Sequence, residues 1–151
     1  MAEVLEIKLT EKLREEERGV YTPGASGSCS KFPAQRYTFR IGFGYPPENV
    51  DKLLGKTLDI INEIRQKGAD QKDIDKFKAE SRRETEIQLK DNNFWLGYLT
   101  NQYFNQDDPA EVLREAEQLN KVTVESTKAA ANNYLSGQNL IRFVLMPERK
   151  Q

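Results

Sequence analysis

Cys29 is the single thiol in a chain of 151 residues that contains no histidine. A cysteine acts as a nucleophile or redox centre when a nearby base or cation lowers the pKa of its thiol. Its neighbours Ser28 and Ser30 supply neither group, so we interpret Cys29 as a small residue in a strand. One thiol without imidazole forms neither an internal disulfide nor an ordinary zinc site. Any hydrolytic chemistry therefore has to be completed by residues outside this sequence.

A second candidate for chemistry is the aromatic segment NNFWLGYLTNQYF, residues 92–104. Its helical spacing places Trp95, Tyr98, Leu99 and Gln102 on a common side. An aromatic cofactor box has this composition, and so does a helix that packs between other helices. Large aromatics bury much area and their polar atoms find partners, so we favour packing.

The composition excludes two classes of partner. Lys and Arg total 23 against 24 for Asp and Glu, giving a formal charge of −1, and no long run of one sign occurs. Nucleic-acid binders draw affinity from clustered cations, so we expect no nucleic-acid partner. No apolar stretch reaches the roughly 20 residues that span a bilayer, and MAEVLEIKLTEK is a charged amphipathic pattern. We therefore expect neither a signal peptide nor a membrane anchor in this chain.

Two segments near the N-terminus have clear periodicity. Residues 3–18 place Leu5, Leu9 and Leu13 at intervals of four, which predicts a helix with one buried face, ended by Gly19. Residues 20–31 are small or β-compatible, and residues 36–45 alternate aromatic or aliphatic side chains with polar or glycine positions. These two segments predict an antiparallel hairpin. Its small first strand either leaves room for something to approach its surface or accommodates large neighbours.

The rest of the chain is predicted to be helical except at its end. Further helices are expected over residues 47–68, from 70 onward, over 92–104, 109–120 and 123–137. Asp70 is the predicted N-cap of the second of these. Residues 139–147, NLIRFVLMP, predict one more strand, followed by a frayed charged tail.

This order predicts an α+β fold in which helices cover one face of a small antiparallel-type sheet. The length favours a single domain over residues 1–151. The first helix begins without a capping residue, and three strands make a small sheet for so many helices. We interpret both features as signs of a domain truncated on its N-terminal side.

The segment LREEERGVYTPGASGS, from Leu13 to Ser28, resembles the C-terminal half of the pitrilysin/insulinase peptidase family. Members carry a helix that ends in Leu-Arg and, after a few polar residues, Gly-x-Tyr or Gly-Tyr at the start of a strand. The segments RYTFRIGFGYPPENVDKLL and NNFWL also resemble bacterial members. The family's domain begins with additional strands and a helix that are absent here. The resemblance implies a partial pitrilysin/mitochondrial-processing-peptidase-like metallohydrolase domain.

In that family, two homologous halves close around a peptide, and the N-terminal half binds zinc through an inverted His-x-x-Glu-His motif. The resemblance implies that this chain binds no metal or other cofactor, that zinc belongs to the other half, and that this half supplies Arg14 and Tyr21. A guanidinium grips carbonyls or a carboxylate, and a phenol donates to a developing oxyanion. Arg18 lies one turn from Arg14, but the Leu-Arg context and the spacing to Tyr21 favour Arg14.

We therefore predict a non-catalytic, substrate-clamping domain of a periplasmic or secreted bacterial zinc metalloendopeptidase. Its expected partners are the zinc-binding half of the same protein and peptide substrates. Two alternatives stay open: an interaction domain of a subunit that has lost catalysis, and an unrelated small α+β binding protein. A truncated domain exposes a strand edge or apolar surface, which favours self-association of the isolated chain.

Overall fold

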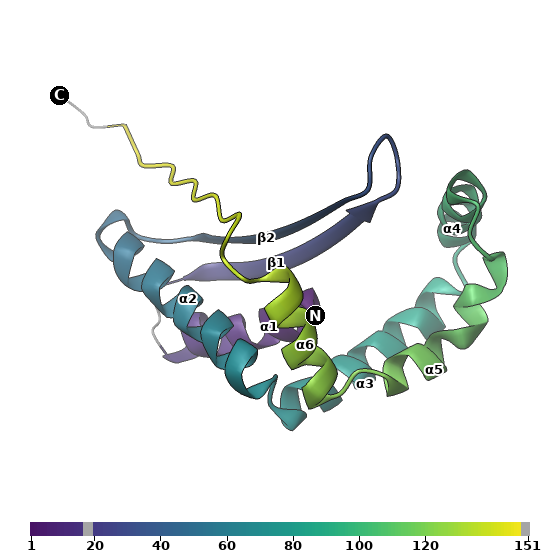
Figure 1. Cartoon of the computed structure of the whole chain (residues 1–151), viewed down its shortest axis with the longest axis horizontal. Coiled ribbons are helices and arrows are strands. Elements are labelled where there is room, and N and C mark those ends of the chain that lie inside the picture. The colour runs from purple at the N-terminus through teal and green to yellow at the C-terminus, as the bar shows by residue number, and fades with distance from the viewer. Residues whose placement is uncertain (17–19, 149–151) are drawn as a thin grey trace.

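The computed structural model describes residues 1–16 and 20–148 and has an α+β architecture (Figure 1). It begins with α1 (Ala2–Leu9) and a π-helical segment, η1 (Thr10–Glu16), followed by strands β1 (Tyr21–Ser30) and β2 (Arg36–Gly44). The remaining elements are helical: η2 (Pro47–Asn49), α2 (Val50–Lys67), α3 (Gln71–Gln88), α4 (Asn92–Asn105), η3 (Pro109–Arg114), α5 (Glu115–Asn120) and α6 (Val124–Tyr134).

The predicted hairpin is confirmed as a two-stranded antiparallel sheet. Its register places Ser26 opposite Arg40 and Ser28 opposite Thr38, with an irregularity between Tyr21 and Gly24. Alternation along β2 sends every second side chain toward one face. Three of these, Phe39, Ile41 and Phe43, pack against the main core.

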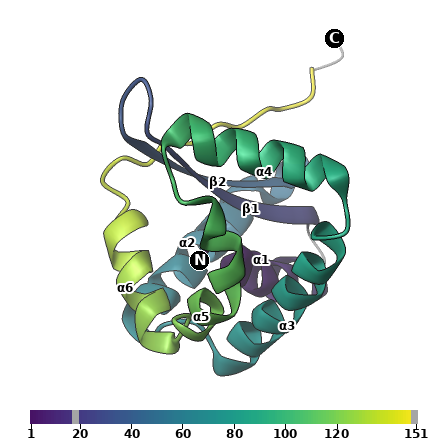
Figure 2. The same cartoon turned by 90° about the vertical axis from the view of Figure 1, so that its right-hand side faces the viewer.

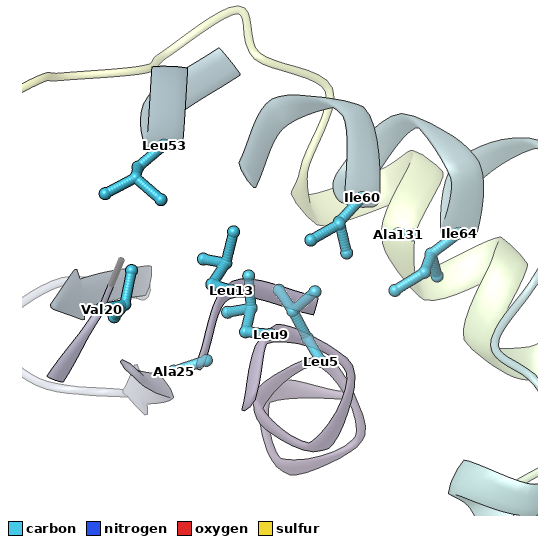
Figure 3. Close-up of a cluster of buried hydrophobic side chains, with 9 residues drawn as sticks. All are labelled: Leu5, Leu9, Leu13, Val20, Ala25, Leu53, Ile60, Ile64 and Ala131. Carbon is cyan, nitrogen blue, oxygen red and sulfur yellow. The ribbon is translucent and has the colours of Figure 1, made fainter. Parts of the chain in front are cut away.

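Helix α1 is the central element because it contacts β1, α2 and α3. Leu5, Leu9 and Leu13 are fully buried, as the four-residue spacing predicts for one face of a helix. Figure 3 shows them converging with the other members of the main core, Val20, Ala25, Leu53, Ile60, Ile64 and Ala131. Burying each leucine side chain contributes roughly 2 kcal/mol. This core therefore fixes η1 and the start of β1 relative to each other.

The corner after α2 depends on a glycine. Gly68 has φ +83° and ψ 177°, a region that essentially only glycine adopts. An added Cβ would lie 2.4 Å from the Val124 carbonyl oxygen. The next residue, Ala69, donates its backbone N–H to Thr127 Oγ1 at 3.0 Å. The predicted end of the helix at Gly68 is confirmed, and the close contact holds α6 against α2.

Helices α3, α4 and α5 form an arm that extends from this core (Figure 1). α3 and α5 are joined through Glu115, which accepts hydrogen bonds from Ser81 and Thr85. Figures 1 and 2 place α4 at the far end of the arm, on the side of the hairpin tip. The arm therefore starts at the core and returns at α4 to the hairpin tip, where Phe32 contacts Phe104.

One prediction about local structure is wrong. Residues 139–147 form no strand, because no described strand lies beside them to pair with. Asp70 is the N-cap of α3 as predicted, although its carboxylate pairs with Lys8 and makes no capping hydrogen bond. The first predicted helix is found over the described residues 2–16, of which 10–16 adopt π-helical geometry.

The aromatic helix packs only in part. Phe94 stacks on Tyr98 with ring centroids 5.7 Å apart, and the Tyr98 hydroxyl donates to the Pro109 carbonyl oxygen at 3.1 Å. By contrast, the exposed fractions of Leu96, Tyr103 and Phe104 are about two thirds or more. The aromatic side chains of α4 therefore stack mainly on one another, Tyr98 links the helix to η3, and the other side of α4 is in contact with solvent.

Candidate functional site

Arg14 lies in the last turn of η1 with an exposed side chain. The neighbouring Leu13 has no exposed surface, so the core fixes the backbone that carries the guanidinium. A cation in this position also interacts favourably with the C-terminal end of the helix dipole. The Arg14 side chain is therefore exposed to solvent at the end of η1.

Tyr21 is the first residue of β1 and lies opposite Gly44 of β2. β1 and η1 contact each other, and Val20, just before Tyr21, is 6% exposed. The two elements that carry the predicted pair thus pack together and meet at one end of the core. Arg18, the other candidate arginine, and Gly19, the predicted cap, lie outside the described residues.

Thr22 follows Tyr21 with φ +45°. This left-handed conformation is a genuine outlier for a β-branched residue and costs on the order of 1–3 kcal/mol. It coincides with the irregularity between Tyr21 and Gly24. The backbone that carries Tyr21 is therefore held in a strained shape by the surrounding core.

Cys29 is exposed and lies opposite Tyr37 in the hairpin. The two residues line an open cavity of about 530 Å³ together with Ser30, Lys31, Gln35, Arg36, Asn105 and Asp107. Burial raises the pKa of Tyr37, and the nearby Cys29 adds to the effect. The fold thus brings cations near Cys29 that its immediate sequence neighbours do not supply.

The hairpin tip is tied to the end of α4. Lys31 donates from Nζ to the Asn105 carbonyl oxygen at 3.1 Å and pairs with Asp107. Phe32 and Phe104 meet edge to face, with ring centroids 5.9 Å apart. The sequence reasoning missed this bridge, because residues 74 and 76 positions apart carry no local signal of contact.

A charged cluster between α1 and α3 was also missed. Lys8 pairs with Asp70, and the hydrogen bond from Lys8 holds the pKa of Asp70 below its ordinary value. Glu11 and Lys72 form an ion pair of 2.7 Å. Asp73 is 3% exposed, its Oδ2 has no described partner, and burial raises its pKa. The sequence around Asp73 does not distinguish this buried carboxylate from an exposed one.

The side chains present do not fit a zinc site. The sequence has no histidine and one cysteine, and the described residues hold no group of three or more metal-ligating side chains placed to bind an ion. No residue in the described ranges is therefore assigned to binding zinc. Within the described part, no helix is both long and apolar enough to cross a bilayer.

Comparison with known proteins identifies a relative that is described as a probable zinc protease. The chain is 26% identical over 138 residues to the probable zinc protease PqqL of Escherichia coli (strain K12), covering 90% of this chain and 15% of that protein. The crystal structure of periplasmic PqqL matches with a TM-score of 0.68 and 23% identity over 88% of this chain and 15% of that chain. This chain thus spans a small part of the curated relative.

A solved peptidase M16 inactive domain from Pseudomonas fluorescens matches with a TM-score of 0.69 and 24% identity, covering 83% of this chain and 29% of that chain. A Helicobacter pylori protease matches with a TM-score of 0.67 at 14% identity, over 89% of this chain and 34% of that chain. Residues 1–81, more than half of the chain, match the family model described as the peptidase M16 inactive domain. The chain therefore belongs to the peptidase M16 inactive-domain family.

Proposed function

We propose that this chain is the non-catalytic, substrate-clamping domain of a zinc metalloendopeptidase. Its partner is the zinc-binding half of the same protein, and together the two halves enclose a peptide. The observation that carries the proposal is the exposed Arg14 on a helical segment packed against β1, whose first residue is Tyr21. The elements that carry the two residues contact each other beside the main core.

The chemistry of the pair suits a peptide in hydrolysis. The Arg14 guanidinium offers a planar fork of donors for a substrate carbonyl or carboxylate. The Tyr21 phenol donates to the oxyanion that develops on the scissile carbonyl. Neither step requires a metal ligand or a base from this chain, so its lack of histidine is consistent with a division of labour between the halves.

The strained backbone at Thr22 supports the same proposal. Residues in sparsely populated conformations cluster at active sites and ligand clamps, where the surrounding fold holds them. Here the strain lies next to Tyr21 and between two buried positions, Val20 and Pro23. We infer that it directs the start of β1 toward the substrate.

The relatives support the setting of this activity. PqqL is a periplasmic protease, and we extend this localisation, periplasmic or secreted, to the protein that contains the present domain. Peptide substrates follow from the same extension.

Substitution in the intact protein tests the assignment. Tyr21→Phe removes one oxyanion donor, which typically lowers kcat by about 100-fold or more, and Arg14→Ala is expected to lower kcat/KM for peptide hydrolysis. Zinc content, measured by atomic emission, stays unchanged because the ligands lie in the other half. Arg83→Ala, an exposed position on α3, is the matched control and keeps normal turnover. Normal turnover in both site variants would overturn the assignment.

One observation favours a second candidate, an interaction domain of a peptidase-like subunit without catalysis. The side chains of Phe143 and Leu145 are 89% and 94% exposed on an extended segment, and exposed apolar surface marks interaction sites. Sequencing the coding region upstream of this chain separates the candidates. A His-x-x-Glu-His motif there supports the peptidase, and its loss supports the interaction domain.

A further inference from the structure

The outer edge of β1 carries backbone groups that β2 does not use. The Ala25 N–H donates to Glu6 Oε2 at 2.9 Å, so this N–H points away from β2. In an antiparallel pair, the N–H and C=O of one residue point to the same edge, and the direction alternates along the strand. Gly27 and Cys29 therefore present their N–H and C=O to the same outer edge as Ala25.

This edge is accessible beyond Ala25. Residues 26–30 are all exposed and carry small side chains. At Gly27 an added Cβ would come within 3.4 Å of the Tyr37 hydroxyl and 3.7 Å of the Phe39 ring. Because glycine has no side chain, no atoms project from the strand at this position. Exposed edges of this kind are templates for pairing with another strand.

The accessible part of the edge is short and closed at both ends. Glu6 covers the N–H of Ala25 at one end, and the bridge from Lys31 to Asn105 and Asp107 closes the other. The five residues between them span about 17 Å at the rise of a strand. Figures 1 and 2 show β1 as the hairpin strand on the side of α1, with which it is in contact. A single strand fits along this length better than the long edge of a second sheet.

The cavity of about 530 Å³ continues this edge. Cys29, Ser30 and Lys31 line it from β1 and its following loop, and Asn105 and Asp107 line it from the end of α4. Lys31 is paired with Asp107, whereas Arg36, also in the lining, has no ion-pair partner among the described residues. The charged side chains that line the cavity, Lys31, Arg36 and Asp107, therefore have a net positive charge, which suits an acidic side chain.

We propose that the outer edge of β1 over residues 26–30, where Gly27 and Cys29 present their outward N–H and C=O groups, binds an extended peptide as an added strand, with an acidic side chain of that peptide in the adjoining cavity. Alternate main-chain hydrogen bonds give such binding its affinity, and a pocket for one side chain gives it a preference. The inference rests on the proposed function, because it assigns this edge to the peptide substrate. It adds a second contact region distinct from Arg14 and Tyr21.

Amide exchange measured by NMR on the 151-residue chain tests the proposal. The probe is an acetylated and amidated eight-residue peptide of alternating threonine and valine with one glutamate. At saturating peptide we expect at least tenfold slower exchange at Gly27 and Cys29 and no change at Ser26 and Ser28, whose amides already face β2. The proposal would be overturned if the peptide slowed exchange equally at Gly27, Cys29, Ser26 and Ser28, or if it slowed exchange at none of them.

Two matched controls sharpen the test. Of two peptides N-methylated at alternating sets of residues, one should lose binding and the other keep it; equal behaviour contradicts strand addition. Gly27→Pro removes one edge donor and should weaken binding at least tenfold, whereas Gly27→Ala keeps the donor and binds within threefold of the original chain. Amide exchange across α2 shows that each variant is folded, and if Gly27→Pro unfolds, the N-methylated pair alone decides.

Other outcomes identify which proposal fails. If Gly27 and Cys29 become protected as the chain is concentrated without peptide, a second copy occupies the edge and the peptide assignment is wrong. Absent edge protection combined with slow turnover in Tyr21→Phe leaves the proposed function standing and removes this inference. If Gly27 and Cys29 are protected with a period of two while the Arg14 and Tyr21 variants turn over normally, the assignment of Arg14 and Tyr21 fails and strand addition at the edge of β1 stands.

Discussion

Substitution of Gly68 measures how closely α6 is held against the end of α2. In Gly68→Ala the backbone at φ +83° and ψ 177° costs on the order of 1–3 kcal/mol for a residue with a Cβ. The new Cβ also lies 2.4 Å from the Val124 carbonyl oxygen and 2.6 Å from its Cγ1, and such overpacking typically costs about 1–3 kcal/mol. We therefore expect the free energy of unfolding to fall by about 2–6 kcal/mol.

Urea denaturation followed by circular dichroism measures this change against two controls. Gly137 also has φ +83°, but an added Cβ there meets no atom within 4 Å. Gly137→Ala should therefore lower the free energy of unfolding by no more than the backbone cost of about 1–3 kcal/mol. Gly55 lies inside α2 with open space around it, and Gly55→Ala should gain about 0.5–1 kcal/mol. If Gly68→Ala costs no more than Gly137→Ala, the described contact between Gly68 and Val124 is wrong.

Three further predictions follow from single features. Thr22→Gly relieves the positive φ and should raise the free energy of unfolding by about 1 kcal/mol; a loss in urea denaturation contradicts the strain. Burial raises the pKa of the Asp73 carboxyl above its ordinary value of 3.8. The folded chain therefore binds the carboxyl proton more tightly than the unfolded chain does. As a result, the contribution of Asp73 to the free energy of unfolding falls as pH rises through the raised pKa. Asp73→Asn should therefore be more stable than the original chain at pH 7, with the advantage shrinking toward pH 4; a pH-independent difference contradicts this. Removing residues 138–151 should lower self-association in analytical ultracentrifugation, whereas removing residues 148–151 keeps the apolar segment and the association; equal behaviour of the two truncations contradicts a role for that segment.

Sequence periodicity predicts those features of the fold that depend on the spacing of residues within a single helix or hairpin. Leu5, Leu9 and Leu13 are buried together because a four-residue spacing puts them on one face of a helix regardless of what covers it. The β1–β2 hairpin and the stop at Gly68 likewise follow from alternation and from the conformational freedom of glycine. These features needed no knowledge of long-range contacts.

The features that sequence reasoning got wrong or missed depend on partners distant in the chain. Residues 139–147 have the composition of a strand, but a strand forms only where another lies beside it. Asp70 is the N-cap of α3 as predicted, but nothing in the sequence indicates that its carboxylate pairs with Lys8, 62 positions away, and makes no capping hydrogen bond. The candidate pair Arg14 and Tyr21 came from family resemblance, and their role in substrate contact stays a prediction.

Complementation in trans tests the central claim most directly. A zinc-binding half expressed without this domain should retain zinc and cleave a fluorogenic peptide slowly or not at all, and adding the 151-residue chain should restore hydrolysis. The same chain carrying Arg14→Ala and Tyr21→Phe should bind the half equally well and restore at most about 1% of the rate, because one oxyanion donor alone is worth about 100-fold. Full restoration by the doubly substituted chain would contradict the account.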